Sequence, residues 1–325
     1  MTKLFRRLPR LQVRTRRTKS CQLNLILVDT TTTERKEETK VRFTNSPLVN
    51  TKKGVTNISK NSNPLDKYYT PLELAEYVVN KTKEIIGEQN ITEYIEPSAG
   101  AGVFLDYLDK PYLAYDIEPE DSRVMEQDYL ELELDYKRGR CVIGNPPFGK
   151  GNTLSVKFYK KSIELADYIA FIQPISQLDN NMQMYEFDLV YSKDLGLHNY
   201  SGKQLHCCFN IYKRPQSGKL NKRPNYKLKD VTIIEYRRNG NSFIPLGYDY
   251  AMGAYGTGCV GKVLNKVGQY CHEYYFYIKN KELKNKVLNV LENYDWKGIS
   301  KGTSMHMLPQ WRIFKILKEE VPGLE

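Results

Sequence analysis

Residues 141–149, CVIGNPPFG, place two consecutive prolines between an asparagine and a phenylalanine, directly after a short apolar run. Proline lacks an amide donor, so it ends a buried strand, and each proline restricts the backbone of the residue before it. The predicted turn holds the side chain of Asn145 and the carbonyl of Pro146 in one direction, beside the ring of Phe148. A rigid pair of acceptors beside an aromatic ring suits catalysis, whereas a loop that merely stops a strand is the simpler interpretation.

Acidic residues also follow predicted strands. Glu96 precedes the turn PSAGAG (97–102), which leads into a helix expected to begin near Ala101, and its small residues let a ligand approach the backbone. Leu105 stands where a phosphate-binding GxGxxG loop would have its third glycine, which counts against a pyrophosphate. The carboxylate of Glu96 favours a cationic or neutral ligand instead. Asp116 lies 20 residues after Glu96, where a carboxylate can accept from both hydroxyls of a ribose.

Alternating helices and strands would position these residues. A helix is predicted over 71–86, where Thr70-Pro71 provides a favourable start. The other predicted elements are strands ending at Glu96, Asp116, Asp128 and Asn145, strands over 167–174 and 206–214, and a helix over 154–166. This alternation predicts an α/β fold with a mostly parallel sheet and helices on both faces, in which ligands bind at the carboxyl ends of the strands. The three acids and Asn145 all fall at such ends.

Seven stretches in this order resemble the N6-adenine methyltransferases that use S-adenosylmethionine. They are YYTPLELA (68–75), EPSAGAG (96–102), YDIEP (115–119), QDYL (127–130), NPPF (145–148), AFIQP (170–174) and CCFNIYKR (207–214). The likeness covers roughly residues 66–215 and is greatest to the small enzymes of phages and restriction–modification systems. It implies a Rossmann-like class I methyltransferase fold with a seven-stranded sheet, a location in the cytoplasm of a bacterium or phage-infected host, and a cognate restriction enzyme as a further partner.

The resemblance assigns the cofactor site residue by residue. Tyr69, Thr70 and Pro71 would line the methionine carboxylate, and Glu96, Pro97, Ser98, Gly100 and Gly102 would surround the methionine amine and sulfonium. Asp116 would bind the ribose hydroxyls, with Ile117 against the cofactor adenine, and Asp128 would accept from its exocyclic amine, with Tyr129 beside it. Asn145 would border both the cofactor and the substrate.

The same resemblance gives NPPF its catalytic role. The adenine amino group is a poor nucleophile, and the Asn145 side-chain oxygen and Pro146 carbonyl would bind its two hydrogens and direct its lone pair at the methyl group. Pro147 would add rigidity, and Phe148 would stack on a base flipped out of the DNA duplex. The implied activity is therefore site-specific methylation of adenine N6 in DNA.

Other acceptors are compatible with this loop. A C5-cytosine enzyme is disfavoured because the chain has no Pro-Cys dipeptide, and N4-cytosine enzymes tend to have serine where Asn145 stands. Methyltransferases acting on RNA, at adenine N6 or guanine N2, and on a protein glutamine have similar loops, although Phe148 in place of tyrosine disfavours the glutamine class. A catalytically inactive DNA-binding relative is a second alternative, which the intact Asn145 and Asp116 argue against.

Charge divides the chain into three predicted parts. Residues 1–60 carry 15 Lys/Arg and 4 Asp/Glu and are expected to be a basic, largely disordered arm, whereas residues 61–215, the predicted catalytic domain, carry 16 and 24. Residues 216–325 carry 18 and 10 and are expected to be an α+β target-recognition region. The candidates for DNA contact there are Lys222, Arg223, Arg237, Arg238 and Lys301.

Composition sets further limits. The six cysteines include no CxxC pair and the four histidines are scattered, so no metal site is expected, and free thiols suit a reducing cytosol. No run of ~18 apolar residues predicts a membrane span. The first 20 residues are basic and free of acids, as in an organellar transit peptide, but lack the apolar core of a secretion signal, and we interpret them as part of the arm.

Overall fold

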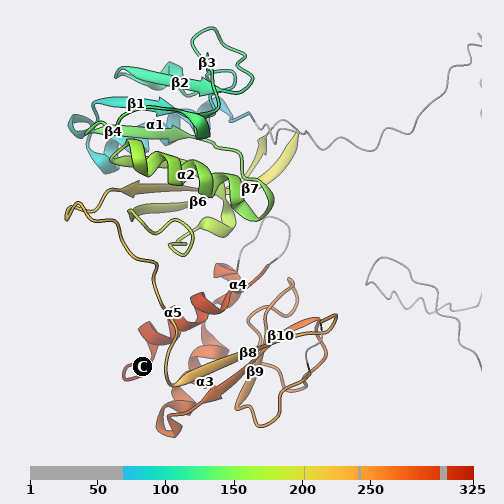
Figure 1. The fold of residues 1–325 in the computed structure, drawn as a ribbon. Helices are drawn as coiled ribbons and strands as arrows, with labels where there is room; N and C mark the ends of the chain where they lie inside the picture. The colour runs from blue at the N-terminus through green and yellow to red at the C-terminus, as the bar shows by residue number, and fades with distance from the viewer. Residues whose placement is uncertain (1–68, 201, 241–242, 301–305) are drawn as a thin grey trace, which may run out of the picture. The chain divides into compact units, whose positions relative to one another are not determined.

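The structure, a computed structural model, describes residues 69–200, 202–240, 243–300 and 306–325. The predicted N-terminal arm lies outside these described residues. Two sheets are present in the described chain, one of seven strands and one of three (Figure 1). The seven-stranded sheet precedes residue 216 and the three-stranded sheet follows it.

The larger sheet has the strand order β3-β2-β1-β4-β5-β7-β6. Its strands are β1 (Glu93–Glu96), β2 (Tyr112–Asp116), β3 (Met125–Glu126), β4 (Arg140–Gly144), β5 (Tyr168–Pro174), β6 (Asp188–Tyr200) and β7 (Lys203–Lys213). The first five strands in this order pair in parallel, and β7 runs antiparallel to β5 and β6. The mostly parallel sheet is therefore confirmed, and its 3-2-1-4-5 order is that of a Rossmann sheet.

Helices cover both faces of this sheet, as predicted. Successive residues of a strand point to opposite faces. On β1, Tyr94 belongs to the core that includes α1 (Leu72–Ile86), and Ile95 belongs to the core that includes α2 (Thr153–Leu165). The strands β4 and β5 alternate in the same way, so two apolar cores hold the carboxyl ends of the central strands in register.

The prediction of a helix beginning near Ala101 was wrong. Gly100 and Gly102 adopt φ values of +50° and +72°, outside the right-handed helical region. The chain instead makes successive turns, with Gly102 N donating to Ala99 O and Leu105 N donating to Gly102 O, before a single 3-10 turn over Leu105–Tyr107. The glycines that suggested a helix start therefore belong to a series of turns that follows β1.

The edges of the sheet also differ from the predictions. The strand expected to end at Asp128 has only two residues, and Asp128 instead caps a 3-10 turn over Tyr129–Glu131. The 13-residue edge strand β6 was not predicted. Its pairing with β7 shifts register between Leu189 and Tyr191 and between Asp194 and Gly196, and such bulges break the alternation that identifies a strand.

Residues after 216 contain strands and helices, as predicted. The strands β8 (Val231–Arg237), β9 (Tyr250–Gly253) and β10 (His272–Ile278) form an antiparallel sheet with β10 in the centre. The helices α3 (Lys284–Asn293), α4 (Trp296–Ile299) and α5 (Gln310–Glu320) share a core with this sheet. Of the helices in the described ranges, none combines the length and apolarity needed to cross a membrane.

Candidate functional site

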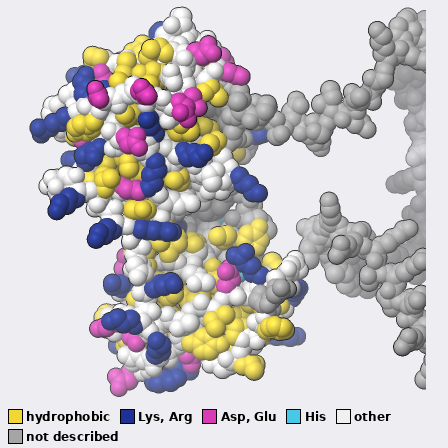
Figure 2. All heavy atoms as spheres, viewed as in Figure 1, with side chains coloured by type: hydrophobic (Ala, Val, Ile, Leu, Met, Phe, Trp, Pro, Cys, Tyr) yellow, Lys and Arg dark blue, Asp and Glu magenta, His cyan; other side chains and the backbone are white. Residues whose placement is uncertain are grey.

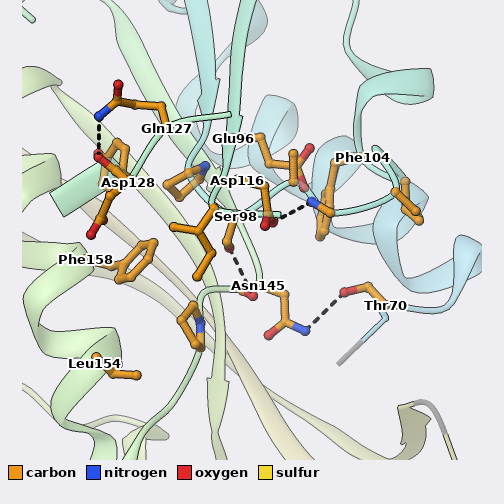
Figure 3. Close-up of a pocket in the computed structure, with 18 of the residues that line it drawn as sticks. Thr70, Glu96, Ser98, Phe104, Asp116, Gln127, Asp128, Asn145, Leu154 and Phe158 are labelled. Atoms are coloured by element: carbon orange, nitrogen blue, oxygen red, sulfur yellow. Dashed lines mark hydrogen bonds between the residues drawn. The ribbon is translucent and has the colours of Figure 1, made fainter. Parts of the chain in front are cut away.

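A cavity of about 320 Å³ opens at the carboxyl ends of β1, β2 and β4 (Figure 3). Most of the residues predicted for the site line it: Tyr69, Thr70, Glu96, Pro97, Ser98, Gly100, Asp116, Ile117, Asp128, Tyr129, Asn145 and Pro147. The topology accounts for this grouping, because parallel neighbours end at the same edge of the sheet.

Four predicted residues do not line the cavity. Pro71 precedes α1, Gly102 lies in the turn after β1, and Pro146 is buried. The ring of Phe148 packs, half-buried, against the core on the α1 side of the sheet. Phe148 therefore lies outside the cavity lining, and its stacking on a flipped base stays a prediction.

Eight residues that line the cavity were not predicted from the sequence, and all but Gln127 are apolar. The lining residues that were not predicted are Ala99, Ala101, Val103, Phe104, Gln127, Leu130, Leu154 and Phe158. Leu154 and Phe158 are four residues apart on α2 and therefore share one face of this helix. Their spacing directly after the NPPF loop was the available signal that this helix contributes to the site.

Glu96 is a buried carboxylate at the end of β1. Its side chain is 2% exposed, and Oε2 has no hydrogen-bond partner among the described residues. Burial raises the pKa of Glu96 well above its ordinary value of 4.5, and the neighbouring Asp116 raises it further. An unpartnered buried acceptor is costly, so this end of the cavity favours a ligand that brings a hydrogen-bond donor or a positive charge.

Glu96→Gln is expected to flatten the dependence of stability on pH. Because the folded-state pKa of Glu96 lies above 4.5, unfolding releases its proton at intermediate pH. Stability from this group is therefore full below about 4.5 and falls as the pH rises toward the folded-state pKa. Thermal unfolding at mildly acidic and mildly alkaline pH should show a smaller loss for Glu96→Gln than for wild type.

The matched control is Glu131→Gln, because Glu131 is exposed on the 3-10 turn after Asp128. This variant should follow the wild-type pH dependence. Equal pH dependence of Glu96→Gln and wild type would show that Glu96 titrates normally in the folded protein.

Asp116 joins two loops at the end of β2. Its Oδ2 accepts from Gly100 N at 2.8 Å, and its Oδ1 accepts from Glu118 N at 2.9 Å. A carboxylate has about four acceptor positions, so two backbone bonds leave capacity for two hydroxyl donors. Ile117 follows with 51% of its surface exposed and supplies an apolar wall beside this carboxylate.

Asp128 and Tyr129 form another part of the wall. Asp128 Oδ1 accepts from Leu130 N at 2.8 Å, which orients the carboxylate at the start of the 3-10 turn. Tyr129 is buried, its ring stacks on Phe158 with 5.5 Å between centroids, and its hydroxyl bonds to Ser162. A planar apolar group would therefore find a flat side wall next to a polar acceptor.

Asn145 follows β4, and its side-chain amide is oriented by Thr70, which lies just before α1. Its Nδ2 donates to Thr70 Oγ1 at 3.1 Å (Figure 3). Its Oδ1 is buried and has no hydrogen-bond partner among the described residues. The backbone oxygen of Asn145 accepts a longer bond from Ser98 Oγ at 3.4 Å. The side-chain oxygen is thus held in place and left for a ligand that donates.

The cationic residues predicted for DNA contact have different surroundings. Lys222 and Arg223 are exposed. Arg237 Nη2 pairs with Glu235 at 2.8 Å, and Arg238 Nη2 donates to Gly268 O and Gln269 O. Lys301 lies outside the described residues.

Nowhere in the described ranges do three His, Cys, Asp or Glu side chains gather as a metal site.

No protein-family model and no curated protein matches the chain. Among solved structures, it resembles a proposed RNA methyltransferase from Pyrococcus horikoshii (17% identity over 49% of this chain and 93% of that one, TM-score 0.39). It also resembles the 23S rRNA methyltransferase ErmE (11%, 46% and 70%, 0.35) and a type I restriction–modification methyltransferase subunit from Streptococcus thermophilus (13%, 79% and 59%, 0.38). The strand order given above shows a Rossmann-like fold in which β7 is antiparallel to its two neighbours.

Proposed function

We propose that the protein transfers a methyl group from S-adenosylmethionine to the N6 amino group of adenine in DNA. The observation that carries the proposal is the buried Oδ1 of Asn145, which has no partner within the described part of the chain. It lies at the start of a Pro-Pro turn, on the wall of a cavity with two buried carboxylates. An amino group on a planar ring could donate the hydrogen bond that this oxygen is free to accept.

The residues present fit S-adenosylmethionine. Its ammonium group would satisfy the unpartnered Oε2 of Glu96 and favour the ionised carboxylate. The remaining acceptor capacity of Asp116 suits the two ribose hydroxyls. Ile117 and Phe158 offer apolar surface for the adenine ring, and Asp128 offers an acceptor for its amine. Thr70 and Tyr69 line the same cavity and are assigned to the methionine carboxylate.

The chain's contribution to catalysis is to bind and orient the acceptor amine. When bound, S-adenosylmethionine supplies an electrophilic methyl group. Asn145 Oδ1 accepts one hydrogen of the amine from the cavity wall. The resemblance assigns the other hydrogen to the carbonyl of Pro146, a residue that is buried beside this wall, and the two bonds together draw the lone pair of the amine out of conjugation with the ring. Thr70 holds the Asn145 amide so that this oxygen is already placed before the substrate arrives. The two prolines keep the second acceptor from turning away.

A duplex base must leave the stack to reach this cavity. We assign target recognition to residues 216–325, whose excess of Lys and Arg suits phosphate contact, in contrast to the acidic residues 61–215. Lys222, Arg223, Arg237 and Arg238 are all exposed and are the candidates for phosphate contact. A cognate restriction enzyme would be the further partner of such a protein.

The class of acceptor is tested with purified protein and S-adenosylmethionine labelled in the methyl group. We expect label in DNA from a host without adenine methylation, and much less in total RNA or in protein. Label in RNA would favour the adenine N6 or guanine N2 alternatives, and label in protein would favour glutamine. No transfer to any of the three, with S-adenosylmethionine still bound, would identify a catalytically inactive relative.

A further inference from the structure

Two large apolar side chains stand almost fully in solvent on the connection between β8 and β9. Phe243 is 91% exposed and Leu246 is 89% exposed, whereas the other exposed large hydrophobic residues among those described reach 66% at most. Exposing most of a Phe or Leu side chain to water is unfavourable compared with burying it. We call Phe243 and Leu246 the apolar wedge.

The segment that carries Leu246 is held by neighbouring contacts. The hydroxyl of Tyr277 donates to Leu246 O at 2.9 Å, and the ring of Tyr248 packs edge-on against Tyr275 with 4.9 Å between centroids. Ile244 lies against Gly268, since a Cβ on that glycine would be 2.7 Å from Ile244 Cδ1. Phe243 and Leu246 project furthest into solvent among residues 243–248, and the contacts of their neighbours reduce the ordering needed when a partner binds.

The segment that supports Ile244 is itself held from inside. Glu273 is fully buried and accepts from Gly268 N, from Tyr270 N and from the hydroxyl of Tyr275. The guanidinium of Arg238 also bonds to Gly268 O and Gln269 O. These bonds place the guanidinium of Arg238 beside Gly268, the residue that Ile244 contacts.

The carboxylates of residues 231–280 are all engaged within the protein. Glu235 pairs with Arg237 and His272, Asp249 pairs with Lys284 at 2.6 Å, and Glu273 has the internal partners described above. Of the cations within residues 231–280, four have no carboxylate partner among the described residues: Arg238, Lys262, Lys266 and Lys279. On the face shown in Figure 2, Lys and Arg side chains lie among hydrophobic ones. The positive charge of these four side chains is not neutralised by a described carboxylate, and it therefore suits contact with a polyanion.

We propose that the apolar wedge enters the base stack of duplex DNA while the unpaired cations of residues 231–280 contact phosphates. Nucleic acid combines a negative backbone with stacked apolar bases, and proteins that bend or open it insert Phe, Leu, Ile, Met or Pro between base steps. This inference rests on the proposed function, because it takes DNA as the substrate. It adds a device that loosens the stack from which a target base must leave.

The test compares Phe243→Ser/Leu246→Ser with wild type on a random-sequence oligonucleotide duplex. Loss of stacking should weaken binding by about ten-fold or more. Because the wedge neutralises no phosphate, the slope of log affinity against log salt should stay unchanged, whereas Lys266→Ala/Lys279→Ala should reduce its magnitude by about 1.8. Wild type should also unwind a closed circular plasmid in a topoisomerase relaxation assay, and the wedge variant should not.

The matched control is Ile85→Ser, an exposed apolar residue in the last turn of α1, far along this helix from Thr70. It should bind and unwind DNA as wild type does, and thermal unfolding of all variants checks that they fold. Equal binding and unwinding by wild type and the wedge variant would overturn the wedge alone. A wedge variant that only loses self-association would identify a contact between protein copies instead. Failure of wild type to bind DNA at all would overturn the proposed DNA substrate as well.

Discussion

Asn145→Ala is expected to lower the turnover of methyl transfer by about 100-fold or more, by analogy with the loss of one oxyanion-hole donor. The variant removes the buried Oδ1 that has no partner of its own among the described residues. It should leave the affinity for S-adenosylmethionine nearly unchanged, because Glu96 and Asp116 are untouched. Single-turnover kinetics together with calorimetry would separate the two effects.

Asn293→Ala is the matched control for this substitution. Asn293 is the last residue of α3 and is exposed, so its loss should leave turnover unaltered. Thr70→Val probes positioning, since it removes the partner of Asn145 Nδ2 while keeping Oδ1. We expect it to lower turnover less than Asn145→Ala. Normal methylation by Asn145→Ala would show that the amine is bound elsewhere.

Asp116→Ala is expected to weaken the binding of S-adenosylmethionine by about ten-fold or more. A lost hydrogen bond to a charged group costs about 1.5–3 kcal/mol, and this carboxylate would bind two ribose hydroxyls. It also accepts from Gly100 N and Glu118 N, so the turn after β1 should loosen as well. Calorimetry measures the affinity, and thermal unfolding without cofactor measures the loosening.

Asp106→Ala serves as the comparison for Asp116→Ala. Asp106 is exposed and pairs with Arg123, which keeps Asp121 as a second partner. The binding of S-adenosylmethionine should be close to that of wild type. If Asp116→Ala bound the cofactor as tightly as this control, the assignment of the ribose site to the end of β2 would be incorrect.

Local signals in the sequence predicted the central fold well. Thr70-Pro71 marked the start of α1 within one residue, and Pro146 and Pro174 marked the ends of β4 and β5. These signals depend only on the geometry of proline and on apolar periodicity. The helix after β1 could not be judged in this way, because glycines serve helix starts and positive-φ turns alike.

The polar part of the site was also visible in the sequence, because strand ends meet at one edge of a parallel sheet. Its apolar walls were not, since Phe104 and Phe158 reach the cavity from a turn and from a helix whose approach depends on tertiary packing. The orientation of Phe148 is likewise a property of packing against the α1 side. Burial of Glu96, which raises its pKa, arises only once the sheet is covered.

The most direct test of the central claim is to sequence DNA from cells that express the protein, with detection of modified bases. We predict N6-methyladenine at one sequence context in cells expressing wild type, and none at that context in cells expressing Asn145→Ala. Modified cytosine at the new sites, or unmodified DNA together with newly methylated RNA or protein, would contradict the assignment of adenine N6 in DNA as the acceptor.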